Sequence, residues 1–303
     1  MLNSALLDAS VVIPTYNRRV ILEKALQALF AQDYPADRYE VIVVDDGSTD
    51  GTEEMIRSLK PSCSFTYQQV ERGGPGRARN IGIRLARGRY IIFIDSDIVV
   101  EPGFISSHLE AHRRAGENAI VHGQVIYTDN LENPTSAQWK LADISRAFFA
   151  TTNASLAREK LIQAGLFDEE FKEYGWEDLE LGLRLRKLGL RAVQCSSCRG
   201  YHYKSRVRVE ALPALRQLER ERGHTAVLFN RKHPTAEVRL MTLYHPFFFG
   251  LERVLSLGGW PDRPGTVHLL RRLEERGWEW PLRFLIRLIR YHAYFEGMRE
   301  ASE

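Results

Sequence analysis

Residues 91–97 read IIFIDSD, in which the apolar run 91–94 leads directly into a segment with two acidic residues. A carboxylate beside four apolar residues is costly unless something compensates its charge. Asp95 and Asp97 are two positions apart, so both side chains would point to one face if the strand continued through them. Hard divalent ions such as Mg²⁺ and Mn²⁺ prefer oxygen ligands, often one or two carboxylates together with phosphate oxygens. The pair therefore predicts a site for a divalent ion and a diphosphate.

A second acidic pair begins the strong helical pattern of residues 177–188, and helical spacing separates that segment into stripes. One stripe, which we expect to face solvent, carries opposite charges at four-residue spacing: Glu177, Glu180, Arg184 and Lys187. The other is apolar and is headed by Asp178: Leu181, Gly182, Leu185 and Leu188. The preference of acids for a first helical turn explains Glu177, but not an acid above a buried face. Asp178 is therefore a candidate general base.

His202 is a further candidate for a role in the site. It lies in the segment YHY, which follows a short predicted strand at residues 191–194. A single histidine is more often structural or exposed than a ligand. A neutral imidazole can nonetheless complete a manganese site. The local sequence leaves both roles open.

These residues need a scaffold, and the first hundred residues alternate strand and helix patterns. Apolar runs predict strands at residues 11–13, 39–44, 65–70 and 90–94. Helical periodicity predicts helices at residues 19–31, 52–59 and 77–86. Strands that are apolar on both faces and separated by helices indicate a parallel sheet covered on both sides.

Polar clusters follow three of these strands, at residues 14–17 (PTYN), 45–48 (DDGS) and 95–97 (DSD). Asp, Asn, Ser and Gly are common in turns, which would explain any single cluster. In open α/β sheets, however, ligands bind beyond the carboxyl ends of the strands. Three clusters at one edge therefore favour a ligand site there.

The pattern is less regular after residue 98. Helices are predicted at residues 103–114, 136–149, 156–164 and 177–188. From about residue 207 the chain is helical and rich in arginine, and residues 258–265 (GGWPDRPG) come nearest to a linker. We divide the chain into residues 1–205 and a helical C-terminal extension, residues 206–303.

Composition narrows the class of protein. The chain has 303 residues and 44% hydrophobic content, enough for one large α/β domain with an appendage. Its net charge of +3 is too small to indicate a nucleic-acid partner, although the residues from Lys204 onward hold 18 Lys and Arg against 12 Asp and Glu. The first ten residues lack the basic segment of a signal peptide, and no apolar run reaches the roughly 20 residues that span a bilayer.

The three cysteines, Cys63, Cys195 and Cys198, do not suggest a disulfide framework. Cys195 and Cys198 form a lone C-x-x-C motif, which lacks the second pair that a structural zinc site would require. A zinc or redox role is therefore weakly supported. A reduced, cytoplasmic protein fits this cysteine content best.

Taken together, these motifs resemble the nucleotide-sugar glycosyltransferases of family 2, which have the GT-A fold. VVIPTYNR and EVIVVDDGSTDGT resemble the nucleotide-binding half of that family, and GGPGRARNIGIRLARGRYIIFIDSD resembles the helix leading to its metal motif. Residues 151–203 are similar to the acceptor-side region shared with galactosyltransferases and polypeptide N-acetylgalactosaminyltransferases. The resemblance covers about residues 10–204. It implies an α/β, Rossmann-like GT-A catalytic domain with a mostly parallel sheet flanked by helices.

The resemblance also implies a role for each matching residue. The nucleotide-sugar would be bound by Pro14, Thr15, Tyr16, Asp46, Arg77, Asp95 and Ser96, with Asp45 supporting the loop. Mn²⁺ or Mg²⁺ would be held by Asp97 and His202. Asp178 would be the catalytic base, and the acceptor site would be lined by Trp176 and Glu177.

The implied activity is a hexosyltransferase reaction, the metal-dependent transfer of a sugar from a nucleotide-sugar, with UDP-sugar expected, to a hydroxyl acceptor. Retaining relatives lack a carboxylate at the base position, so Asp178 favours inversion. A sugar nucleotidyltransferase is the enzymatic alternative, but its Gly-rich phosphate loop is absent after the first strand. A non-catalytic nucleotide-sugar-binding subunit is disfavoured by the intact Asp97 and Asp178. No G-x-G-x-x-G follows residues 11–13, which argues against NAD.

Residues 280–300 predict an amphipathic, basic helix in which Arg283, Arg287 and Arg290 share a stripe. Basic amphipathic helices with Trp and Phe can lie in a membrane interface, where anionic lipid adds attraction. They can equally pack on the catalytic domain or form a homodimer contact. The membrane interpretation implies a peripheral position on the inner face of the cell membrane and a lipid-linked or polysaccharide acceptor.

Overall fold

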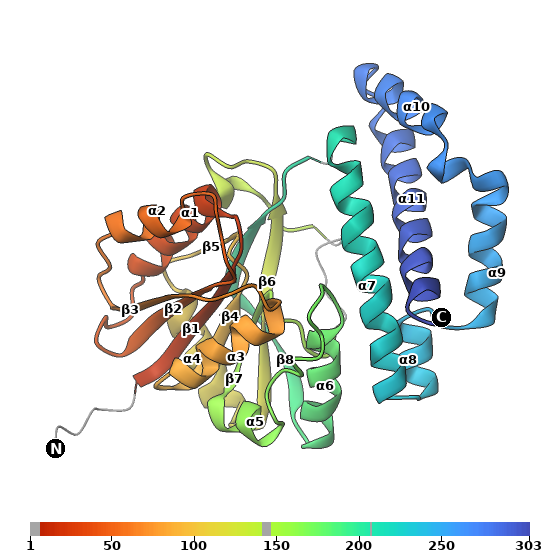
Figure 1. Ribbon diagram of the computed structural model, residues 1–303. Coiled ribbons are helices and arrows are strands. Elements are labelled where there is room, and N and C mark those ends of the chain that lie inside the picture. The colour runs from red at the N-terminus through yellow and green to blue at the C-terminus, as the bar shows by residue number, and fades with distance from the viewer. Residues whose placement is uncertain (1–6, 141–146, 207) are drawn as a thin grey trace. The chain divides into compact units, whose positions relative to one another are not determined.

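The computed structural model describes residues 7–140, 147–206 and 208–303 (Figure 1). The chain divides into two compact units. The first holds the described residues up to Lys172 and, in addition, Glu177–Ser205. The second holds Glu173–Trp176 and Arg206–Glu303. The four residues before Glu177 thus belong to the helical unit, which the sequence did not suggest.

An eight-stranded sheet forms the centre of the first unit, counted over its described residues, in the order β3-β2-β1-β4-β7-β6-β8-β5. The strands are β1 Leu7–Thr15, β2 Tyr39–Asp45, β3 Ser64–Gln69, β4 Gly88–Ile94, β5 Ile98–Val100, β6 Ala119–Thr128, β7 Asn153–Ala157 and β8 Arg191–Tyr203. β1 pairs in parallel with β2 and β4, β2 with β3, and β6 with β8. β7 runs antiparallel to β4 and β6, and β5 runs antiparallel to β8. The predicted α/β, mostly parallel sheet is confirmed.

Successive side chains of a strand point to opposite faces of the sheet, and in the central strands both sets are apolar. Helices can therefore pack on both faces. The helices are α1 Arg19–Phe30, α2 Thr52–Ser58, α3 Pro75–Leu85, α4 Phe104–Ala115, α5 Arg158–Gln163 and α6 Glu177–Lys187, with a 3₁₀ turn, η1, at Pro134–Ser136. In β1, Val11 and Ile13 join one buried cluster with Leu22 of α1. Val12 joins the other cluster with Ile83 of α3. Because β1 runs parallel to both β2 and β4, the carboxyl ends of these three strands lie at one edge of the sheet, as predicted.

Three predictions for the middle of the chain were wrong in whole or in part. The helix predicted at residues 136–149 is not present at 137–140 or 147–149, and residues 141–146 lie outside the described residues. The helix predicted at residues 156–164 begins only at Arg158, because Asn153–Ala157 is the buried strand β7. β8 does not end at residue 194 but continues to Tyr203. Strands rich in Asn, Ser, Ala and Cys carry little of the β-branched and aromatic pattern that predicts a strand.

Cys195 and Cys198 form a disulfide within β8, which the sequence analysis did not predict. β8 is irregular at this point, because its register with β6 shifts between Gly123 and Gln124. The two Cα atoms lie 5.5 Å apart, within the usual range for a bridge. Cys63 is free. The expectation of a fully reduced chain therefore does not hold for this pair.

The second unit is built from helices: α7 Leu212–Lys232, α8 Ala236–Met241, α9 Pro246–Leu255, α10 Pro264–Glu275 and α11 Glu279–Glu300, with 3₁₀ segments η3 Val209–Ala211 and η4 Leu257–Asp262. The sequence that suggested a linker lies inside this unit, mostly within η4. α7 and α11 lie side by side (Figure 1). Among the described helices, none combines the length and the apolar content that crossing a membrane requires.

Two glycines allow the close approach of α7 and α11. A Cβ on Gly297 would lie 2.2 Å from the carbonyl oxygen of Arg220, and a Cβ on Gly223 would lie 2.3 Å from that of Tyr294. Neither position has room for a methyl group, because the neighbouring atoms belong to helix backbone. The packing of this unit therefore depends on glycine at both positions.

Gly297→Ala should destabilise the chain by about 1–3 kcal/mol, because the added methyl group overpacks the α7–α11 contact. Urea denaturation followed by circular dichroism measures the change. Gly250→Ala in α9 is the matched control, since no atom lies within 4 Å of a Cβ there and alanine has the higher helix propensity. Equal stability of Gly297→Ala and the parent chain would contradict the close approach.

Candidate active site

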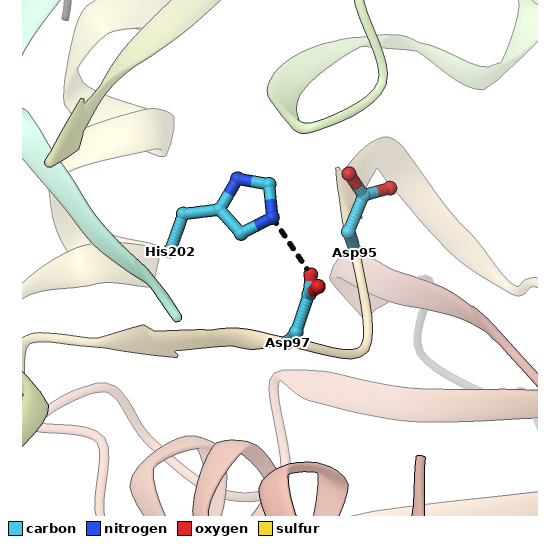
Figure 2. Close-up of side chains that lie close together, drawn as sticks. All are labelled: Asp95, Asp97 and His202. Atoms are coloured by element: carbon cyan, nitrogen blue, oxygen red, sulfur yellow. Dashed lines mark ion pairs between the residues drawn. The ribbon is translucent and has the colours of Figure 1, made fainter. Parts of the chain in front are cut away.

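Asp95, Asp97 and His202 converge beside the end of β4 (Figure 2), with one ligand atom of each within 4.8 Å of the others. β4 ends at Ile94 and β5 begins at Ile98, so the two acids lie in the turn between strands. The sequence analysis had assumed that the strand continues through both acids, and it does not. β5 pairs with β8 so that Ile98 stands opposite His202. This antiparallel pairing, which the sequence did not predict, is what places the histidine beside the acids.

The charge of each acid is set by different neighbours. Burial by itself would raise the pKa of Asp97, but its hydrogen bond with the neighbouring His202 imidazole and the charge of Arg18 hold that pKa below its usual value. The His202 Nε2 atom lies 3.0 Å from Asp97 Oδ1. Burial raises the pKa of Asp95, Arg79 opposes the rise, and the charge of Asp97 adds to it. The two carboxylates are thus unequal, with Asp97 the more readily ionised.

The donor set fits a divalent ion. Two carboxylates and an imidazole suit Mn²⁺ or Mg²⁺ better than a soft metal. His202 is buried and stacks on Tyr127, and its Nδ1 atom has no hydrogen-bond partner among the described residues. Thr15 Oγ1, at the end of β1, is also buried without a partner there. Buried polar atoms are normally hydrogen-bonded, so the unpartnered Thr15 hydroxyl is consistent with a ligand at this sheet edge, whereas the unpartnered Nδ1 of His202 is the ring nitrogen that does not contact Asp97.

A second carboxylate–histidine group, Asp262, His292 and Glu296, meets the same spacing criterion in the helical unit. Its acids are already paired, however, because Arg216 lies against Asp262 and Arg220 Nη2 lies 2.9 Å from Glu296 Oε2. The arginines beside the first group lie farther from its acids, with Arg79 Nη2 3.4 Å from Asp95 Oδ1 and Arg18 Nη1 3.9 Å from Asp97 Oδ2. We interpret this group as an ion-pair network.

Arg79 of α3 links the acids that follow β4 to those of α6. Its Nη1 atom lies 3.0 Å from Glu177 Oε1 and 3.7 Å from Asp178 Oδ1, and its Nη2 atom lies 3.4 Å from Asp95 Oδ1. The side chain is only 7% exposed. Burial opposes its charge, but the three carboxylates raise the pKa of the guanidinium, which stays positive. Arg79 is therefore the buried counter-charge of the site.

Sequence reasoning missed Arg79. It named Arg77 as a nucleotide-sugar contact, which stays a prediction. Arg77 donates from Nη1 to the carbonyl oxygen of Glu71, 2.9 Å away. The signal that identifies Arg79 is its place four residues before Ile83, on the buried face of α3. A charge on such a face requires a buried partner, which the sequence alone does not identify.

The charged stripe predicted to face solvent in α6 is buried at its acidic positions. Glu177 is 5% exposed and Glu180 is 2% exposed. Glu180 pairs with Arg184 at four-residue spacing, while Glu177 pairs with Arg79. Burial raises the pKa of Glu177, the charge of Asp178 raises it further, and Arg79 opposes both effects. The prediction failed at Glu177 because its partner, Arg79, lies on another helix, and at Glu180 although its partner, Arg184, belongs to α6 itself.

One oxygen of Asp178 is fixed and the other is not. Oδ2 accepts hydrogen bonds from the backbone N–H and the hydroxyl of Thr151, at 3.0 and 2.9 Å. Oδ1 is buried and has no hydrogen-bond partner among the described residues. The carboxylate is therefore oriented by Thr151, just before β7, with Oδ1 left to accept a proton or a hydrogen bond.

The predicted donor residues surround the ends of β1 and β2. Thr15 is paired in register with Asp45, and Asp45 accepts hydrogen bonds from Ser48 N and Tyr67 Oη at 2.8 and 2.7 Å. Both oxygens of Asp46 accept from backbone N–H groups, those of Gly73 at 2.7 Å and Gly74 at 3.0 Å. Asp46 thus anchors the segment that begins α3. Its contact with a nucleotide base stays a prediction.

Three other predicted residues take different positions. Tyr16 is exposed beneath the guanidinium of Arg72, which lies 4.4 Å from the ring centroid. Pro14, beside Val44 of β2, and Ser96, buried in the turn after β4, flank the same strand ends. These placements leave their predicted donor contacts untested.

Trp176 belongs to the helical unit rather than to the sheet. It has a left-handed backbone, with φ of 69°, and its ring packs near Phe229 and Tyr294. Its Nε1 atom donates to the carbonyl oxygen of Arg222 at 3.0 Å, and the residue is 8% exposed. The indole is therefore used for packing in that unit, and its role towards an acceptor stays a prediction.

Known proteins share both the sequence pattern and the fold of this chain. The family model of Glycosyl transferase family 2 matches residues 10–167, just over half of the chain. Validoxylamine A glucosyltransferase from Streptomyces hygroscopicus subsp. jinggangensis is 32% identical over 219 residues, covering 60% of this chain and 52% of that protein. Chondroitin synthase from Escherichia coli is 29% identical over 236 residues, covering 64% and 34%. The chain spans less than two thirds of the length of these relatives.

Solved structures show the same fold. The mannosyltransferase PcManGT from Pyrobaculum calidifontis, in complex with GDP-Man and Mn²⁺, has a TM-score of 0.62 at 20% identity, covering 97% of this chain and 88% of that chain. TarS 1–349 from S. aureus, in complex with UDP-GlcNAc, has a TM-score of 0.55 at 18% identity, covering 98% and 92%. At such identities the likeness establishes the fold alone.

Arg79→Met should destabilise the chain by about 3–5 kcal/mol at neutral pH, because it leaves buried carboxylates without their counter-charge. Urea denaturation measures the loss. Arg84→Met on the same helix is the control, since the Arg84–Glu169 pair is largely exposed and such pairs are worth about 0–1 kcal/mol. A loss in Arg79→Met no larger than in the control would contradict the role given to Arg79.

Proposed function

Since the chain belongs to glycosyl transferase family 2, we propose that it is an inverting, divalent-metal-dependent hexosyltransferase that uses a UDP-sugar. The observation that carries the proposal is the position of Arg79, which lies against Asp178 on one side and Asp95 on the other. A candidate base and a candidate metal site are thereby held within the reach of one side chain. Sugar transfer from a metal-bound diphosphate requires this combination.

Asp97 and His202 are the residues that would hold Mn²⁺ or Mg²⁺, with Asp95 beside them at the ribose. A bound ion would act as a Lewis acid that stabilises negative charge on the leaving diphosphate. Asp178 accepts the proton of the attacking hydroxyl at Oδ1 while Thr151 holds Oδ2. The acceptor oxygen bonds to the anomeric carbon as the bond to the diphosphate breaks. Attack from the face opposite the leaving group gives inversion.

The nucleotide and the acceptor are proposed from the relatives. Solved structures similar in fold were determined with UDP-GlcNAc, with UDP and with GDP-Man, which supports a nucleotide-sugar donor. Relatives named chondroitin synthase and poly(ribitol-phosphate) beta-N-acetylglucosaminyltransferase TarS support a glycan or polymer acceptor. We propose a polysaccharide or lipid-linked acceptor, with residues 1–205 as the catalytic domain and residues 206–303 as an extension that works at the inner face of a membrane.

A sugar nucleotidyltransferase has no need for a base placed like Asp178. A non-catalytic binding subunit has no need for a buried Oδ1 atom of that residue that lacks a hydrogen-bond partner among the described residues and has the Arg79 guanidinium 3.7 Å away. Both alternatives therefore leave the best-defined part of the site unexplained.

Asp178→Asn should bind the UDP-sugar with unchanged affinity and lose about 10²- to 10⁴-fold in kcat, because the acceptor proton has no base to receive it. Thermal shift with nucleotide-sugar and Mn²⁺ measures binding, and release of UDP in the presence of acceptor measures turnover. Asp37→Asn, at an exposed acid of the same unit, is the control. Turnover in Asp178→Asn equal to that of the control would refute the assignment.

Removal of divalent ions with EDTA should abolish transfer, and Mn²⁺ or Mg²⁺ should restore it. In Asp97→Asn the concentration of Mn²⁺ needed for half-activity should rise at least about tenfold, because one carboxylate ligand is lost. Asp262→Asn, in the other carboxylate–histidine group, should leave this requirement unchanged. Full activity in EDTA, or an equal shift in both variants, would contradict the metal assignment.

A further inference from the structure

An ordinary surface helix buries its apolar residues and exposes its charged ones, and α9 does the reverse. The one residue that it buries is an acid, Glu252, which is 5% exposed. Its apolar residues face outward instead, with Phe247 65% and Val254 63% exposed. Leu257, at the start of η4, is 73% exposed. An exposed apolar surface of this kind commonly marks an interaction site.

An apolar groove of about 220 Å³ lies beside this surface, within the helical unit. Its walls come from α9, η4 and α11, and include Leu251, Leu255, Trp260, Leu288, Tyr291 and Phe295. Glu252 also lines the groove, but it is satisfied by Arg299 Nη1 at 2.8 Å and by His292 Nδ1 at 2.6 Å. The groove therefore offers no unpaired charge to a ligand. Its chemistry suits a hydrocarbon chain.

Arginines outnumber acids on the exposed surface of the segment from α9 to α11, which includes α10. Between residues 246 and 290, seven arginines are exposed against three acids. Asp262 is paired with Arg216, which lies outside this segment, and Glu279 is paired with Arg283, which is itself one of the seven. Arg287 stands at the groove itself, 5.6 Å from the ring centroid of Tyr291. The apolar surface is thus bordered by positive charge.

Charge decides between the two partners that would bury this surface, a second copy of the chain or a lipid bilayer. A two-fold dimer would place the same patch on both sides, and so bring arginine against arginine. Anionic headgroups complement the arginines, while acyl chains complement the apolar residues between them. α11, the helix that its sequence marked as a membrane candidate, instead buries Leu282, Ile286 and Ile289 in the unit. Trp280 and Phe284, near the start of α11, are exposed as well, at 77% and 49%. The exposed apolar residues considered with the groove are those of α9 and η4.

We propose that α9 and η4 bind an anionic phospholipid bilayer, and that the groove between α9, η4 and α11 receives one acyl chain. Phe247, Val254 and Leu257 enter the interface, and Arg253 and Arg287 lie at the level of the phosphates. The inference deepens the proposed function, and rests on it in one respect: a lipid-linked acceptor would be presented at that bilayer.

The test is sedimentation of the full chain with vesicles of phosphatidylcholine alone or mixed with phosphatidylglycerol. The parent chain should bind the mixed vesicles at least about tenfold more tightly than the neutral ones. The double variant Val254→Glu, Leu257→Glu should lose at least about tenfold in affinity for the mixed vesicles. Ile162→Glu, at an apolar residue of α5 that is 50% exposed, is the matched control and should bind like the parent chain. Equal binding by the double variant and the control would overturn the proposal.

Fluorescence quenching tests separately whether an acyl chain enters the groove. Vesicles with brominated acyl chains should quench the fluorescence of Trp260, so the quenched fraction should fall in Trp260→Phe. Quenching that is unchanged by this substitution would overturn the placement of a chain in the groove. A concentration-dependent dimer that the double variant abolishes, detected by light scattering, would assign the surface to self-association and overturn the lipid proposal.

Activity measurements separate this inference from the proposed function. Hydrolysis of UDP-sugars without vesicles should be the same in the parent chain and in Val254→Glu, Leu257→Glu. If hydrolysis is intact and vesicle binding is absent, the lipid proposal alone fails. If no nucleotide-sugar is turned over but vesicle binding follows the expected pattern, the proposed function alone fails.

Discussion

One buried guanidinium, that of Arg79, holds the candidate site together. It meets Asp95 after β4 and the pair Glu177 and Asp178 at the start of α6, three carboxylates that would repel one another without it. Buried charges of one sign are tolerated only beside a compensating charge with good geometry. The first half of the fold supplies that charge from α3, and the second half supplies two of the acids. The site is therefore a product of the whole sheet unit rather than of one motif.

The change of strand direction in the sheet makes this meeting possible. The parallel strands β1, β2 and β4 bring their polar ends to one edge. β7 then runs antiparallel to β4, and Thr151 just before it reaches Asp178. β8 pairs antiparallel with β5 and brings His202 to Asp97. Thr151 thus reaches the site from the start of an antiparallel strand, whereas His202 lies near the end of β8, which runs in the same direction as β4.

The sequence predicted the parallel half of the fold well, because its strands are continuous apolar runs separated by amphipathic helices. It failed where burial rests on polar or small residues. β7 was hidden by Asn153 and Ser155, which hydrogen-bond to buried histidines of α4. Arg79 and the burial of Glu177 were missed for a related reason: the partner of a buried charge can lie about a hundred residues away, where no local pattern shows it. The position of α9 in its unit was equally beyond local sequence, since only tertiary packing buries Glu252 and leaves the apolar residues outside.

The central claim is that Asp97 and His202 hold a divalent ion close to a base, Asp178, of the same site. A crystal structure with UDP and Mn²⁺, examined by anomalous scattering at the manganese edge, tests it most directly. The account predicts one strong anomalous peak coordinated by Asp97 and His202, with the diphosphate beside it. A peak at Asp262 and His292 instead, or UDP bound with no metal peak at Asp97, would contradict it.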